Sequence, residues 1–103
     1  MADFIRIAGT SDIPKGTMKA FEHRHHRLVI CHTDEGIYAL ADECTHDSAP
    51  ISDGELRGQE VVCTRHGARF DVSDGSVMAP PALVPVDTYE VKVEGDDILV
   101  KLD

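Results

Sequence analysis

The chain has no apolar run long enough to cross a bilayer, which takes about 20 residues. It is also poor in basic side chains, because 10 Lys and Arg stand against 19 Asp and Glu, a formal net charge of −9. Nucleic-acid binding needs a basic surface, so this balance argues against DNA or RNA as a partner. The length of 103 residues allows one domain, residues 1–103, and no second one.

Targeting signals are missing as well. The start, residues 1–7, alternates like a strand and contains neither the apolar core of a signal peptide nor a twin-arginine pair. We therefore expect a cytoplasmic monomer without a membrane anchor. Only three cysteines are present, and they cannot all pair, which fits a reducing compartment. Cys31 closes the apolar run of residues 28–31, so we expect it to be a small buried core residue.

The other two cysteines belong to two short clusters, Cys44-Thr45-His46 and Cys63-Thr64-Arg65-His66. Zinc ligands usually have two to four residues between them, whereas one residue separates Cys44 from His46. That spacing is easier to satisfy if the two side chains reach different metal atoms. Two thiolates and two imidazoles are the donor set of a Rieske [2Fe–2S] cluster, in which two histidines bind one of the irons. We expect Cys44 and Cys63 to hold the inner iron, and His46 and His66 the outer one.

Gly67 follows the second cluster directly, where we expect the backbone to pass close to the metal without a Cβ in the way. A structural zinc domain built from the same four residues remains the alternative from the residues alone.

The motif C-x-H-x16-C-x-x-H resembles the bacterial Rieske-type ferredoxins, and the likeness extends over residues 54–63 (G-x-L-x-G-x-x-V-x-C), 67–71 (G-x-x-F-D) and the proline loop of residues 79–82. The resemblance implies a β-sandwich with a small cluster-binding subdomain, about residues 42–82. It also implies an electron carrier, not an enzyme, that passes single electrons from a flavin-dependent ferredoxin reductase to a terminal oxygenase. The small Rieske-like subunit of assimilatory nitrite reductase is the other function that such a likeness allows.

Two departures from the respiratory Rieske proteins bear on the reduction potential. Neither loop contains the second cysteine that forms a disulfide in those proteins, and Ala68 and Phe70 stand where they place hydroxyl groups. Fewer hydrogen bonds to sulfur leave the added electron less stabilised. We therefore expect a potential near the low end of the Rieske range, on the order of −150 mV.

Alternating apolar residues and turn signals predict an all-β antiparallel sandwich or barrel without a long helix. The predicted strands cover residues 4–8, 18–23, 27–32, 37–41, 60–64 and 69–72, and a closing hairpin pairs residues 86–93 with 98–102.

Three side features have simpler explanations than a second site. The histidines of residues 23–26 and His32 are expected to be exposed polar residues of an edge strand. Asp42 and Glu43 are expected to form a solvated rim beside the first loop. The scattered acidic residues keep the protein in solution or steer it toward a basic patch on a redox partner.

Overall fold

The computed structural model describes residues 3–43, 50–63, 67–80 and 84–102, and strands dominate this part of the chain. The all-β prediction is therefore confirmed. The elements are β1 (Asp3–Gly9), η1 (Thr10–Asp12), β2 (Thr17–His23), β3 (His26–Thr33), β4 (Gly36–Ala41), η2 (Ile51–Asp53), β5 (Glu55–Arg57), β6 (Glu60–Val62), β7 (Arg69–Asp71), β8 (Val77–Ala79), β9 (Thr88–Tyr89), β10 (Val91–Glu94) and β11 (Asp97–Leu102). The two η elements are single turns of 3₁₀ helix. Among the described residues, no helix is long and apolar enough to cross a membrane.

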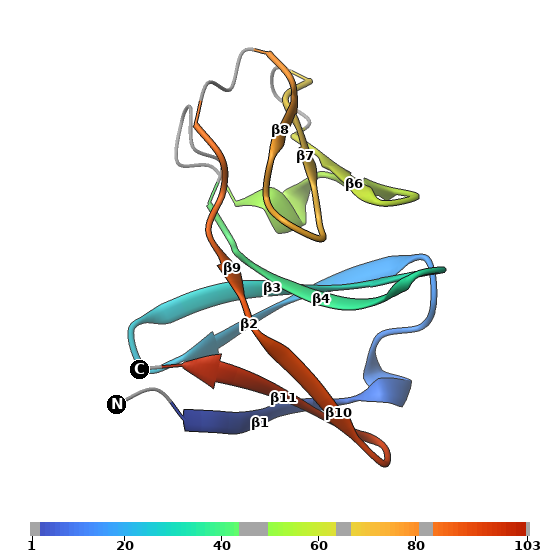
Figure 1. The fold of residues 1–103 in the computed structure, drawn as a ribbon, viewed down its shortest axis with the longest axis vertical. Coiled ribbons are helices and arrows are strands. Elements are labelled where there is room, and N and C mark those ends of the chain that lie inside the picture. The colour runs from blue at the N-terminus through green and yellow to red at the C-terminus, as the bar shows by residue number, and fades with distance from the viewer. Residues whose placement is uncertain (1–2, 44–49, 64–66, 81–83, 103) are drawn as a thin grey trace.

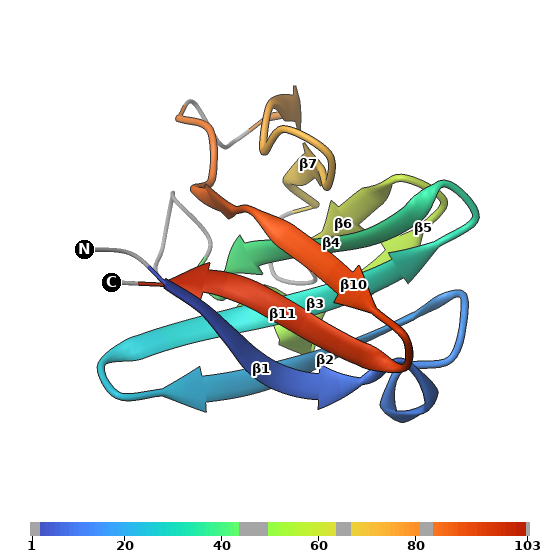
Figure 2. The same cartoon turned by 60° about the horizontal axis from the view of Figure 1, so that its bottom comes forward.

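The described strands form three antiparallel sheets (Figure 1). The outer sheet has the order β1-β11-β10, the middle sheet β2-β3-β4-β9, and the lobe sheet β5-β6-β7-β8. In Figure 1 the outer sheet lies at the bottom, the middle sheet above it, and the lobe sheet at the top. Figure 2 shows β1, β11 and β10 in front of the middle sheet, so these two sheets form the sandwich and the lobe sheet projects from it.

Strand β3 is covered on both faces. Its residues 28–31 are fully buried, which explains why this strand is a continuous apolar run without alternation. Leu28 and Ile30 pack toward the outer sheet, whereas Val29 and Cys31 pack toward the lobe sheet. The core on the outer side also contains Ala8, Ile13, Ala39, Ile98, Val100 and Leu102. The core on the lobe side also contains Leu40, Ile51, Val61, Cys63, Ala68, Phe70, Val72 and Val86.

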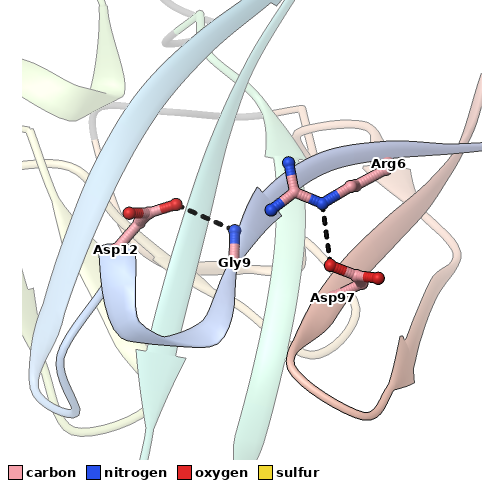
Figure 3. Close-up of polar contacts among 4 residues, drawn as sticks. All are labelled: Arg6, Gly9, Asp12 and Asp97. Atoms are coloured by element: carbon pink, nitrogen blue, oxygen red, sulfur yellow. Dashed lines mark hydrogen bonds and ion pairs between the residues drawn. The ribbon is translucent and has the colours of Figure 1, made fainter.

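The outer sheet is joined at its edge by polar contacts (Figure 3). Arg6 on β1 donates from Nε to Oδ1 of Asp97 on β11 at 2.8 Å, and this carboxylate raises the pKa of the guanidinium. The N–H of Gly9 donates to Oδ2 of Asp12 at 2.9 Å, which caps η1. These contacts lie far from the lobe sheet and determine only how the chain enters the sandwich.

One predicted strand is wrong in a way that matters for the topology. The pattern over residues 86–93 predicted a single strand, but it breaks at Glu90 into β9 and β10. β9 pairs with β4 in the middle sheet, and β10 pairs with β11 in the outer sheet. The alternation of apolar and polar residues continues where the chain passes from one sheet to the other, so the sequence pattern could not show the break. β5 and β8, three residues each, were not predicted.

The histidine-rich segment is a hairpin and not one strand. β2 ends at His23 and β3 begins at His26, and Arg24 in the turn has a φ of +56°. β2, which ends at His23, is an edge strand of the middle sheet, as predicted, but His26 and His32 lie on the inner strand β3. His25 is exposed as predicted, whereas His23, His26 and His32 are half-buried, and Nδ1 of His32 is 2.7 Å from the carbonyl oxygen of Ile13. Within the described ranges, no three His, Cys, Asp or Glu side chains group in a way that could hold a metal ion.

Candidate metal centre

Of the four predicted ligands, the structure places Cys63. This residue directly follows β6, is 4% exposed and carries a free thiol. Cys44, His46 and His66 lie outside the described residues. The structure therefore gives the position of one predicted sulfur ligand and the framework that holds both ends of each predicted ligand loop.

The second loop runs from β6 to β7 and is closed by backbone hydrogen bonds. The N–H of Cys63 donates to the carbonyl of Ala68 at 2.7 Å, and the N–H of Gly67 donates to the carbonyl of Cys63 at 2.9 Å. Gly67 has a φ of +76°, a conformation that favours glycine. The structure thus supplies a conformational reason for Gly67. Its predicted close approach to the metal stays a prediction, and no described atom lies within 4 Å of the place a Cβ would take.

The first loop leaves β4 and returns at η2, and its two ends are tied together by Asp42 and Ser52. Oδ1 of Asp42 accepts a hydrogen bond from the Ser52 N–H, and Oδ2 accepts one from the Ser52 hydroxyl, each at 2.7 Å. Asp42 is only 6% exposed. The prediction of a solvated rim is therefore wrong for Asp42, because both of its oxygens are satisfied inside the protein; Glu43 is exposed. A serine ten residues after an aspartate is no recognised motif, so the sequence carried no signal for this pair.

The bases of the two loops lie against each other. The N–H of Gly54 donates to the carbonyl of Ile51 at 2.9 Å, which ends η2. A Cβ on Gly54 would lie 1.9 Å from the carbonyl oxygen of Val62, the residue before Cys63. Only glycine allows so close a backbone approach, and β5 then pairs with β6 from Glu55 opposite Val62. The exit of the first loop is thereby held beside the entry of the second.

A further close approach holds the segment that follows the proline loop. A Cβ on Gly75 would lie 2.0 Å from the carbonyl oxygen of Val86, and the N–H of Val86 donates to the Gly75 carbonyl at 2.9 Å. Val86 is buried, so the chain is anchored again soon after residues 81–83. Pro81 and Ala82 of the predicted proline loop lie outside the described ranges, whereas Ala79 ends β8 and Pro80 is exposed.

The surroundings of Cys63 are apolar. Ala68 and Phe70 are fully buried in the same core, and neither carries a hydroxyl. Iron–sulfur clusters are held by cysteine sulfurs, and a buried cysteine bordered by apolar side chains is suited to that role. Cys63 at the base of a closed loop, with the first loop held beside it, therefore fits a metal cluster that bridges two loops. Cys63 would bind its iron from the side of the core.

Cys31 is the other described cysteine, and it confirms the prediction of a buried core residue. It is fully buried on β3. Burial raises the pKa of its thiol to about 12, and the negative charge of Asp42 contributes to the shift. A thiol that resists ionisation is a poor nucleophile and a poor metal ligand, so Cys31 takes no part in the site.

Comparison with known proteins agrees with this geometry. Residues 3–90 match the family model of the Rieske [2Fe–2S] domain. The chain is 38% identical over 98 residues to the ferredoxin component of biphenyl 2,3-dioxygenase from Rhodococcus jostii (strain RHA1), covering 95% of this chain and 92% of that protein.

Solved structures lead to the same family. The ferredoxin of carbazole 1,9a-dioxygenase from Nocardioides aromaticivorans IC177 superposes with a TM-score of 0.89 at 30% identity, covering 94% of this chain and 95% of that one. A ferredoxin chain in a complex of reduced oxygenase and oxidised ferredoxin of carbazole 1,9a-dioxygenase gives 0.90 at 29% identity, with 95% and 92% covered. The cofactor of this fold is one Rieske-type [2Fe–2S] cluster, and the chain belongs to the Rieske [2Fe–2S] domain family.

Proposed function

We propose that this protein is the ferredoxin component of a multicomponent dioxygenase system. It takes one electron from a flavin-dependent reductase and delivers it to a terminal oxygenase. One observation carries this proposal: the likeness to a dioxygenase ferredoxin component extends over nearly the whole of both chains. On this basis the protein is an electron carrier that catalyses no bond-making step itself, and the nitrite reductase and zinc alternatives are not favoured.

The ligand assignment is part of the proposal. Cys44 and Cys63 hold the inner iron and His46 and His66 the outer one; the burial of Cys63 beside the lobe-side core supports the inner position for sulfur. We assign residues 42–82 to the cluster-binding subdomain within a single domain of residues 1–103. The separate hydrogen bonding of the lobe sheet, from Glu55 to Ala79, supports that division.

In its proposed role, the protein would hold the [2Fe–2S] cluster, whose charge changes on reduction, in a fixed position that is partly shielded from water. The cluster supplies a reversible one-electron couple. Ala68 and Phe70 keep water and hydroxyl donors away from the side of Cys63, which disfavours the extra negative charge and keeps the potential low. The backbone bonds of Cys63 to Ala68 and Gly67 hold the two ends of the loop together, which would limit movement of Cys63 when the charge of a bound cluster changes.

The surface charge supports docking to a basic partner. The net charge of −9 steers the carrier toward a positive patch on a reductase or oxygenase, and salt screens such attraction over about 10 Å at 0.1 M. We also propose that the protein works in the cytoplasm, which the unpaired thiol of Cys31 supports.

The experiment is anaerobic purification followed by metal analysis, electron paramagnetic resonance and reconstitution of electron transfer. We expect iron and acid-labile sulfide in equal amounts and a Rieske-type signal after reduction. We also expect electron transfer from the flavin-dependent reductase to the terminal oxygenase of a dioxygenase system, with rates that fall as salt rises. One zinc without sulfide would reject the cluster. A proper cluster that neither enzyme can reduce or oxidise would reject the dioxygenase role alone.

A further inference from the structure

Asp42 is a buried charged side chain that electron transfer does not itself require. Among the described residues, Thr33 and Asp42 are the polar residues that are buried. The N–H of Asp42 donates to the carbonyl of Arg27 at 3.0 Å, so its backbone is still fixed to the middle sheet. Its carboxylate accepts both the N–H and the hydroxyl of Ser52, each at 2.7 Å. One residue thus links the middle sheet to η2, across the base of the first loop.

The link continues from η2 to the second loop. Ser52 lies in the middle of η2, whose last residue is followed by Gly54. Gly54 lies against the backbone carbonyl of Val62, and Val62 precedes Cys63. The chain of contacts therefore runs from the middle sheet through Asp42 and Ser52 to the loop that carries Cys63.

Apolar packing alone does not fix the position and orientation of η2. Ile51 is buried in the lobe-side core and attaches η2 to it, but apolar contacts have little directional preference. Two hydrogen bonds from one residue to both oxygens of a carboxylate set distance and orientation together. The pair therefore fixes how the ends of residues 43–51 are arranged.

We propose that Asp42 is a positioning residue which, through Ser52, holds the two ends of the first predicted ligand loop in place beside Val62 and Cys63, at the start of the second. A cluster held by both loops keeps its geometry and stays bound only while these loops keep their separation. The inference rests on the proposed ligand set and adds to it the residue pair that holds the ligand loops together.

The test compares variants of the cluster-loaded protein. Ser52→Ala removes the hydroxyl bond and leaves the backbone bond. Ser52→Thr keeps both bonds and is the conservative control. Asp53→Asn removes one negative charge from the exposed neighbour of Ser52. Val100→Ala loosens the core between the middle and outer sheets without touching the lobe, and so controls for a general loss of stability.

Three quantities are measured for each variant: the rate of cluster loss to an iron chelator, the g-values of the reduced protein, and the melting temperature. We expect Ser52→Ala to lose its cluster about tenfold faster than the unsubstituted protein, with shifted g-values, because a hydrogen bond to a charged group is removed. Ser52→Thr and Asp53→Asn should behave like the unsubstituted protein. Val100→Ala should melt earlier with unchanged g-values.

If Ser52→Ala does not yield loaded protein, Asp42→Asn replaces it. Asparagine keeps the side-chain volume and one oxygen that can accept from the Ser52 N–H, but it removes the charge, and its NH₂ group can only donate to the Ser52 hydroxyl. We expect about a threefold faster loss for that variant. The proposal is overturned if Ser52→Ala or Asp42→Asn loses its cluster no faster than Val100→Ala at an equal drop in melting temperature, with g-values unchanged. An unsubstituted protein without a Rieske-type signal would instead reject the proposed function.

Discussion

Gly54→Ala tests whether the two loop bases are as close as the structure places them. The added Cβ would lie 1.9 Å from the carbonyl oxygen and 3.0 Å from the carbonyl carbon of Val62, and 3.2 Å from the carbonyl oxygen of Ile51. All three are backbone atoms, so no side chain can rotate away to make room. The conformation itself is not the obstacle, because Gly54 has a φ of −89°. The whole effect is therefore steric.

The expected cost follows from what must move. Overpacking of a well-packed site costs about 1–3 kcal/mol. The shift also weakens the hydrogen bond from the Gly54 N–H to Ile51, which contributes about 1 kcal/mol. We expect a loss of about 3 kcal/mol from a total stability on the order of 5–15 kcal/mol. For a chain of this size, that lowers the melting temperature by about 10–20 °C.

Gly58→Ala is the matched control, since it lies in the turn between β5 and β6 of the same sheet. Gly58 has a φ of +58°, but nothing lies within 4 Å of its Cβ position. Its cost is conformational only, about 1 kcal/mol. Thermal unfolding followed by circular dichroism measures both variants, and chelator-induced bleaching measures cluster retention. If Gly54→Ala melts no earlier than Gly58→Ala, the contact between Gly54 and Val62 is refuted.

Three further predictions follow from single residues. Cys63→Ser should prevent stable cluster assembly, whereas Cys31→Ala should keep the cluster; metal analysis of both variants decides, and full iron retention in Cys63→Ser would reject the ligand assignment. Burial raises the pKa of the Cys31 thiol to about 12 from 9.0, so above pH 9 the unfolded chain releases a proton that the folded protein keeps. Stability should therefore fall as the pH rises from 9 toward 12. Denaturant unfolding at pH 7.5 and 10 should show an extra loss of about 1 kcal/mol in the unsubstituted protein relative to Cys31→Ala, and an equal loss in both would contradict the shift. Because Ala68 and Phe70 offer no hydroxyl, electrochemistry should give a potential on the order of −150 mV, and a clearly positive value would contradict this reasoning.

The strands could be predicted where local pattern and burial agree. β1 to β4, β6, β7 and β11 begin or end within two residues of the predicted ranges wherever the structure describes them, because alternation and turn residues act over short distances. β5 and β8 are three residues each, too short for a periodic signal. The break at Glu90 was not predicted, because it arises from a change of pairing partner. β9 pairs with β4 and β10 pairs with β11, and the local sequence pattern does not show which strand is the partner.

The candidate site was likewise predictable only in part. The ligand types and their spacing are visible in the chain, and Cys63 is buried as expected of a sulfur ligand on the inner side. The Asp42–Ser52 pair was not foreseen, and the sequence suggested a solvated rim instead. In the sequence, Gly54 is only the first glycine of the run of residues 54–63 that resembles the family, and only the approach of Val62 explains why no other residue can replace it.

By itself, the sequence determined which chemistry is available and that Cys31, at the end of an apolar run, is a buried core residue. Donor atoms, their spacing and an apolar run are properties of the covalent chain, and physical chemistry constrains what they can do. Only the tertiary structure decided what holds the loops in place. Contacts such as Asp42 with Ser52 and Gly75 with Val86 depend on how three sheets stack, and stacking brings together residues whose separation along the chain carries no signal.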